Sequence, residues 1–207
     1  MKRIKEIYAY REMIASLVRR DLRGRYKGSV LGFLWTFINP LLQLVVYTMV
    51  FSVIMRSGID KYYIFLFVAL VPWIFFSSAL TGGSGCIIAS QDMVKKIFFP
   101  REVLPIAYIT SSFINMLLTF IVVFAVLIVT GFGVNPVALL YLIPIMLIEY
   151  ILALGIAFLA SALSVYFRDL QYILGIIAMA WQFLTPVMYG QELVEESLAG
   201  HPVMITI

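Results

Sequence analysis

Long runs of uncharged, mostly apolar residues dominate the chain. A helix needs about 20 apolar residues to cross a hydrocarbon core of about 30 Å. The longest run, 103–148, exceeds one crossing, and turn-forming residues from Gly131 to Pro136 interrupt it. No Asp, Glu, Lys or Arg occurs within 28–55, 62–91, 103–148, 150–167 and 170–191. The pattern therefore predicts five membrane spans, at about 31–55, 62–81, 103–130, 138–165 and 170–190.

Helices are the expected form of all five spans. A lone strand exposed to lipid would leave its backbone polar groups unpaired. No run shows the alternating pattern, over about ten residues, of an outer-membrane barrel. Pro40 and Pro72 fall inside spans, so a neighbouring helix or a water-filled cavity must satisfy the carbonyls that they free. We expect an all-α, polytopic membrane helix bundle with its transmembrane domain at 28–190.

The segment 1–27 carries a periodic pattern instead of an apolar run. One helical face collects apolar side chains at spacings of three or four, with a gap at Arg11: Ile4, Ile7, Tyr8, Ile14, Leu17, Val18 and Leu22. The other face carries Lys5, Arg11, Glu12, Arg19 and Arg20. This predicts an amphipathic helix over 4–22 that lies on the membrane, with its apolar side in the lipid. A signal peptide is excluded, because the basic region is long and no small-residue cleavage site follows.

Lys and Arg are distributed unevenly among the loops. Nine of them precede residue 28, three lie within 91–102, and Arg168 lies between the last two spans. The other loops contain only Arg56 and Lys61. Because basic loops stay in the cytoplasm, we expect a multi-pass protein of the inner (cytoplasmic) membrane with a cytoplasmic N-terminus. The segments 56–61, 131–137 and 191–207 then face outside.

Composition supports a membrane protein. Hydrophobic residues make up 63% of the 207 residues and charged residues 13%, and the mean hydropathy is +1.02. Soluble domains contain about a quarter charged residues. The composition excludes a soluble enzyme, a disordered chain and a secreted disulfide scaffold, and we expect no nucleic-acid partner. Cys86 is the single cysteine and has no partner for an internal disulfide.

Sets of residues for catalysis or metal binding are missing from the sequence. His201 is the single histidine, so neither a Ser-His-Asp set nor a metal site with His and Cys ligands is expected. The cluster from Gly82 to Gly85 is not a phosphate loop, because no Gly-Lys-Ser/Thr follows it. In a membrane helix such a cluster permits close helix approach or marks a helix end. We expect this chain to bind no cofactor, metal or ATP by itself.

A few side chains are candidates for lining a transport path. Glu149 is the one acid inside a predicted span, where an ionisable group is a functional candidate by default. Pairing with a polar group of a neighbouring helix is the alternative. Aromatic rings could stack on sugars, although an interfacial belt is the better explanation for any one of them. The aromatic candidates, at differing predicted depths, are Trp35, Tyr47, Trp73 and Trp181.

The predicted cytoplasmic loop 91–102 combines charged with apolar residues. Its second half reads Lys95, Lys96, Ile97, Phe98, Phe99, Pro100, Arg101 and Glu102. A short element of this kind suits docking into a groove of a soluble partner. A helix lying on the lipid headgroups is the alternative reading of the same residues.

Four stretches together resemble the permeases of type-2 ABC exporters, which carry lipid-linked polysaccharides and polyol-phosphate polymers such as O-antigen and teichoic acid. The residues from Arg20 to Trp35, with Asn39-Pro40-Leu41, are similar to that family's approach to its first span. Those from Lys95 to Pro105 are similar to its ATPase-coupling loop. The stretches 166–170 and 185–189 match the link before its fifth span and the end of that span. The resemblance covers essentially the whole chain.

The resemblance implies a permease that pairs with a second copy of itself around a channel. Two separate ATPase subunits, which hold ATP and Mg, would dock beneath it and drive an undecaprenyl-diphosphate-linked glycan outward. Coupling is then expected at 95–102 with Arg168 and Asp169. The basic stretch Arg20, Arg23, Arg25, Tyr26 and Lys27 is expected near the lipid pyrophosphate, since arginine forks match phosphate oxygens. The family continues into a sixth span, so 191–207 is expected to begin a re-entrant region of an incomplete chain.

Two other functions stay open. A membrane-embedded enzyme acting on polyprenyl phosphates would need clustered acids or histidines at the membrane surface. The acids Asp92, Glu102 and Asp169 are instead dispersed. An ABC exporter of small lipids or drugs would share the composition, and the quoted motifs alone argue against it.

Overall fold

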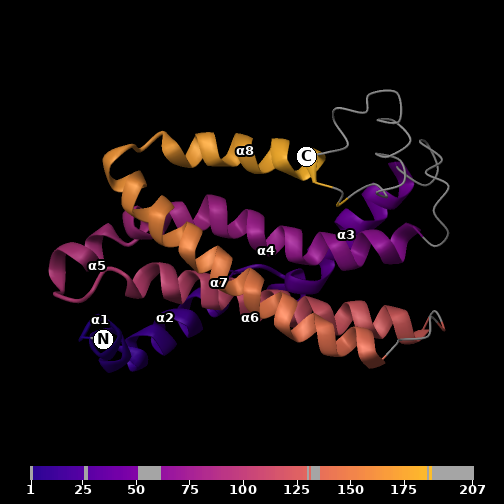
Figure 1. The fold of residues 1–207 in the computed structure, drawn as a ribbon, viewed down its shortest axis with the longest axis horizontal. Helices are drawn as coiled ribbons and strands as arrows, with labels where there is room; N and C mark the ends of the chain where they lie inside the picture. The colour runs from indigo at the N-terminus through magenta and orange to yellow at the C-terminus, as the bar shows by residue number, and fades with distance from the viewer. Residues whose placement is uncertain are drawn as a thin grey trace.

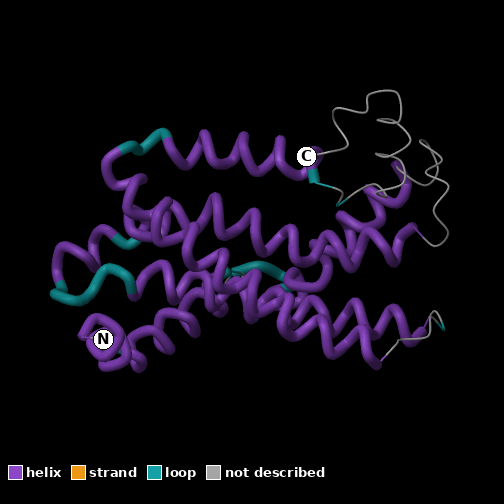
Figure 2. The backbone as a smooth tube through the Cα atoms, viewed as in Figure 1, coloured by secondary structure: helices purple, strands orange, loops and turns teal. Residues whose placement is uncertain are grey.

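The computed structural model describes residues 2–25, 28–50, 62–129, 131, 136–185 and 187. These residues form helices and turns and contain no strand (Figures 1 and 2), which confirms the predicted all-α bundle. The helices are α1 (Lys2–Ala9), α2 (Arg11–Gly24), the short 3₁₀ helix η1 (Gly32–Leu34), α3 (Trp35–Thr48), α4 (Tyr62–Ala89), α5 (Gln91–Lys96), α6 (Val103–Val129), α7 (Pro136–Tyr166) and α8 (Leu170–Leu184).

Among the described residues, three helices are long and apolar enough to cross a membrane: α4, α6 and α7. The third and fourth predicted spans, 103–130 and 138–165, correspond closely to α6 and α7. The first and fifth correspond to the shorter α3 and α8, of 14 and 15 residues. Parts of these two predicted spans, 51–55 and 188–190, lie outside the described residues.

The second predicted span is too short. Helix α4 does not stop at residue 81 but runs through the glycine cluster to Ala89. Gly82 faces Tyr108 of α6, where a built Cβ would lie 1.8 Å from the tyrosine oxygen. Gly83 faces α7, where a built Cβ would lie 3.1 Å from the Cβ of Ala157. The glycines therefore permit close helix approach, and they do not end the helix.

Helix α4 is the centre of the bundle and contacts α3, α6, α7 and α8. Its side chains Leu66, Phe67 and Leu70 are almost completely buried. Helix α7 crosses α4 (Figure 1) and packs against it. The buried small residues of α7 are Ala153, Ala157, Ala160, Ser161 and Ser164. Small residues allow the two backbones to approach closely, as expected where lipid offers no hydrophobic driving force between helices.

The N-terminal segment is two helices, not the single one predicted over 4–22. The chain bends at Tyr10, which has φ −92° and ψ 15°, next to the gap in the apolar spacing at Arg11. The apolar face of α2 packs against α6, and its Leu17 and Val18 are buried there. This part of the face therefore contacts protein, whereas the prediction gave it to lipid.

Three loops expected on one side of the membrane lie at one end of the bundle. Helix α1, helix α5 and the link between α7 and α8 gather there, at the left of Figure 1. The turn at Gly131, with φ +66°, lies at the opposite end. The grouping agrees with the uneven distribution of Lys and Arg, while the assignment of the basic end to the cytoplasm stays a prediction.

Candidate functional site

The 91–102 loop presents one aromatic side chain and buries its neighbour. Helix α5 ends with the exposed Lys95 and Lys96, and the chain becomes extended at Ile97. Phe98 is 97% exposed, whereas Phe99 is 7% exposed. The alternation follows from the extended backbone, in which successive side chains point in opposite directions. Of the two phenylalanines, Phe98 is therefore the one available to a partner.

Phe99 anchors the loop to the bundle. It belongs to a cluster, which we call the basal cluster, between α2, α4 and the first turns of α6. Its buried members are Leu17, Val18, Cys86, Phe99, Val103, Leu104 and Ala107. The prediction that Phe99 contacts an ATPase directly is not supported by this burial, because docking would require its removal from the cluster.

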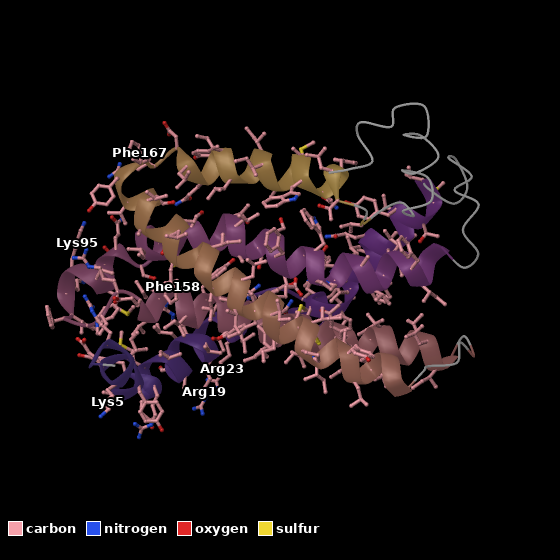
Figure 3. The ribbon with its side chains drawn as sticks, in the orientation of Figure 1. Lys5, Arg19, Arg23, Lys95, Phe158 and Phe167 are labelled. Atoms are coloured by element: carbon pink, nitrogen blue, oxygen red, sulfur yellow. The ribbon has the colours of Figure 1, made fainter. Side chains whose placement is uncertain are left out.

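The rest of the predicted coupling set lies at the same end of the bundle. Arg101 is exposed, Pro100 is half-buried, and Glu102 accepts a hydrogen bond from Arg3 of α1 at 3.1 Å. Arg168 and Asp169 are exposed in the link before α8. Figure 3 shows Lys95 and Phe167 at this end, with Lys5 of α1 below them. The structure thus brings together residues from three distant parts of the sequence.

A groove of about 660 Å³ opens between α1, the 91–102 loop and α7. Its walls are mostly apolar, and they include Phe98 and Phe99 from the loop and Phe158 and Val165 from α7. Four charged residues also line it: Arg3, Glu6, Arg101 and Glu102. The sequence analysis did not find this groove, because its walls come from segments about 60 to 150 residues apart.

A polar cluster joins the C-terminal end of α2 to α6. The Arg25 guanidinium donates to Asp21 at 3.1 and 3.2 Å, to Ser112 at 2.8 Å and to Ser111 at 3.3 Å. The Ser111 hydroxyl also donates to Asp21, and the guanidinium lies 5.9 Å from the centre of the Tyr108 ring. We call this group the α2–α6 clamp. Both serines are buried, so the clamp satisfies polar groups that would otherwise be unpaired in an apolar interface.

The clamp separates Arg25 from the other predicted phosphate ligands. Arg25 is half-buried with its carboxylate and hydroxyl partners in place, whereas Arg20 and Arg23 are exposed. Tyr26 and Lys27 lie outside the described residues. A second groove, of about 610 Å³, runs along α2 and is lined by Glu12, Ala15, Ser16, Arg19, Arg20, Arg23 and Gly24. Figure 3 shows Arg19 and Arg23 along this helix.

The candidate channel residues do not form one group. Trp73 and Trp181 both contact Phe76, with ring centroids 5.8 and 5.6 Å apart, so they join α4 to α8. Trp35 donates its indole N–H to Ser29 at 2.8 Å. The remaining two are Tyr47, packed on the main core, and the half-buried Glu149 of α7. These positions support packing for the tryptophans of α4 and α8, and they do not outline a path.

Comparison with known proteins assigns the chain to a protein family. Residues 12–198 match the family described as ABC-2 type transporter. The chain belongs to the ABC-2 type transporter family. The match includes α2 with its clamp, the 91–102 loop and all the spans. It makes this chain a multi-pass membrane component of a transporter.

Several relatives of this ABC-2 chain have names that state their cargo. It is 39% identical, over 95% of its length and 75% of the relative's, to the O-antigen export system permease protein RfbA of Myxococcus xanthus. It is 34% identical, over 91% and 73%, to the RfbA protein of Klebsiella pneumoniae. It is 25% identical, over 85% and 69%, to the polysialic acid transport protein KpsM of Escherichia coli.

Within the described residues of this ABC-2 chain, no group of three or more His, Cys, Asp or Glu side chains could hold a metal ion.

Sequence reasoning missed the partners of Arg25, although two signals for them existed. Asp21 and Arg25 are spaced i, i+4 on a helix, which favours an ion pair. Ser111 and Ser112 form a polar pair in an otherwise apolar run.

Proposed function

We propose that this chain is the permease subunit of an ATP-driven exporter that moves a lipid-linked polysaccharide across the inner membrane. The cargo class is supported by the names of the relatives, two of which export O-antigen and one of which transports polysialic acid. The diphosphate-linked polyprenyl carrier and the teichoic acid alternative rest on the sequence resemblance alone. In this proposal two copies of the chain form the transport path.

The proposed contact with an ATPase is based on one observation: Phe98 is exposed, whereas the neighbouring Phe99 is buried. An aromatic side chain that is 97% exposed, with Lys95 and Lys96 next to it, is the arrangement of a docking element. The anchor Phe99 lets a force on the loop reach α2 and α6. We infer that a separate ATPase subunit, with ATP and Mg, binds at this end, and that Arg168 and Asp169 lie at the edge of the contact.

The exposed arginines of α2 are proposed to receive the anionic headgroup of the cargo. Arg19, Arg20 and Arg23 are exposed, line one groove and form none of the hydrogen bonds of the clamp. Planar guanidinium groups bind phosphate oxygens in pairs, which suits a diphosphate. Arg25 is proposed to hold α2 in place for them, and not to bind the phosphate itself.

The test is a deletion of the gene in its host with complementation. We expect the deletion strain to lose surface polysaccharide and to accumulate the lipid-linked polymer inside, where a glycan-binding probe reaches it only after permeabilisation. The wild-type gene should restore surface staining, and a Phe98→Asp gene should not. Normal surface polysaccharide in the deletion strain would exclude this cargo and favour an exporter of small lipids.

A further inference from the structure

The groove beside the 91–102 loop has its charges at one end. Arg3, Glu6, Arg101 and Glu102 belong to α1 and the loop, at the basic end of the bundle. Farther along, the walls include Phe158, Ala162 and Val165 of α7. Two lining residues of α7 carry hydroxyls: Tyr166, at the end of the helix, and Ser161, whose hydroxyl donates to the Phe158 carbonyl of its own helix at 3.2 Å. The far part of the groove therefore presents an apolar surface.

The groove also has the length of a membrane leaflet. Phe158 and Tyr166 both line it and are eight residues apart on α7, which corresponds to about 12 Å at 1.5 Å per residue. Figure 3 shows Phe158 farther from the basic end than Phe167. Half of a hydrocarbon core of about 30 Å is about 15 Å. An occupant with a polar head and an apolar tail fits, whereas a soluble protein would have to enter the hydrocarbon.

The signs of the charges select the headgroup. Arg3 and Glu102 form an ion pair with each other at 3.1 Å. Glu6 and Arg101 are exposed, and neither forms an ion pair with any side chain that the structure describes. One exposed carboxylate and one exposed guanidinium on the same groove complement a headgroup that carries both an ammonium and a phosphate. A purely anionic headgroup would meet Glu6 unfavourably.

We propose that this groove binds one zwitterionic phospholipid with a primary ammonium, from the leaflet at the basic end. Its phosphate contacts Arg101, its ammonium contacts Glu6, and an acyl chain runs along α7 toward Phe158. The lipid thereby joins α1, the 91–102 loop and α7 in one unit. The inference depends on membrane insertion and not on the cargo, so it stands or falls separately from the proposed function.

The test uses photo-crosslinking at two neighbouring positions of α7. Ala162 lines the groove, whereas the exposed Leu163 does not. A benzophenone amino acid replaces each in turn, and the purified full chain is reconstituted into vesicles of equal phosphatidylethanolamine and phosphatidylglycerol. At Ala162 we expect adducts enriched in phosphatidylethanolamine by about tenfold, because one charge-assisted pair to the ammonium discriminates by about that factor. At Leu163 the adducts should follow the bulk ratio.

Headgroup variants complete the test. Glu6→Gln should abolish the enrichment at Ala162, because it removes the partner of the ammonium. Arg101→Gln should lower the total adduct yield and keep the enrichment, because both lipids carry the phosphate that it contacts. The matched changes Lys5→Gln on α1 and Arg168→Gln after α7 should leave both quantities unchanged. Adducts at Ala162 in the bulk lipid ratio would overturn the proposal. Crosslinking of Ala162 to a second copy of the chain, or to a co-reconstituted ATPase, would assign the groove to that protein and overturn it as well.

Discussion

Phe98 and Phe99 are adjacent in the sequence, yet their side chains are 97% and 7% exposed. A charge at each position should therefore have a different effect. Phe98→Asp removes an exposed apolar contact, so we expect loss of ATPase pull-down with normal membrane insertion and heat stability. Phe99→Asp breaks the basal cluster, and loss of a buried phenylalanine costs about 3–5 kcal/mol. The measurements are pull-down of the co-expressed ATPase and fluorescence-detected gel filtration after heating.

Two outcomes would contradict this assignment. If Phe98→Asp retained full binding to the ATPase, the loop would not be its docking element. If Phe99→Asp were as heat-stable as the wild type, the assignment of Phe99 as a buried anchor would be wrong. Phe98→Leu serves as the control, because it keeps an apolar side chain and should preserve most of the binding.

The α2–α6 clamp predicts energetic coupling between Asp21 and Arg25. Asp21→Asn replaces the carboxylate that accepts from Arg25 with a neutral amide oxygen, and a hydrogen bond between charged groups contributes about 1.5–3 kcal/mol, part of which is lost. The double variant Asp21→Asn/Arg25→Gln should cost less than the sum of the two single variants, by about 0.5–3 kcal/mol. Apparent melting temperatures in detergent measure both quantities. The exposed Arg23→Gln should shift the melting temperature little, and strict additivity at the clamp would show that the two side chains act independently.

Gly82 predicts a larger steric effect than the other glycines of the bundle, because its built Cβ has the shortest contact. In Gly82→Ala the new methyl group would meet the Tyr108 ring, which is itself held beside Arg25. Overpacking of this kind costs about 1–3 kcal/mol. Gly155→Ala and Gly175→Ala are matched controls, because no atom lies within 4 Å of their built Cβ. A lower melting temperature for Gly82→Ala alone is the expected result, and equal melting temperatures for all three variants would be inconsistent with the close approach.

The exposed arginines of α2 predict a loss of cargo response without a loss of stability. Arg20→Gln/Arg23→Gln removes two charged donors, each of which contributes about 1.5–3 kcal/mol to a phosphate contact. We expect at least a tenfold higher cargo concentration for half-maximal ATPase stimulation of the reconstituted complex, with an unchanged basal rate. Arg11→Gln, which removes a charge stacked 5.2 Å from the Tyr8 ring, is the control on the same helix. An unaltered response in the double variant would leave α2 with an anchoring role only.

Sequence patterns predicted the helical elements well, because uncharged runs in a membrane protein have few alternatives to helix. The errors came from residues whose role depends on a neighbour distant in sequence. The Gly82 cluster permits either a helix end or a close contact, and only the position of Tyr108 decides between them. The bend at Tyr10 likewise follows from the packing of α2 on α6, which amphipathic spacing does not reveal.

The sequence predicted which residues belong to the candidate site, but it did not predict their burial or their partners. The basic and aromatic residues of the 91–102 loop were identified, yet their pattern did not distinguish Phe98 from Phe99. Arg25 was grouped with Arg20 and Arg23 because all three are arginines near one another in sequence. Their different environments arise from Ser111 and Ser112, almost 90 residues away.

The basal cluster and the α2–α6 clamp both connect α2 to α6, at points about one to two helical turns apart. Phe99 and Leu17 meet in the cluster, and Arg25 and Ser112 meet in the clamp. Two attachment points suppress the swivelling that a single one would allow. In the proposed function, an ATPase that displaced the loop at Phe98 would therefore move α2 and α6 together, and the membrane-spanning α6 would tilt through the same angle as the amphipathic α2.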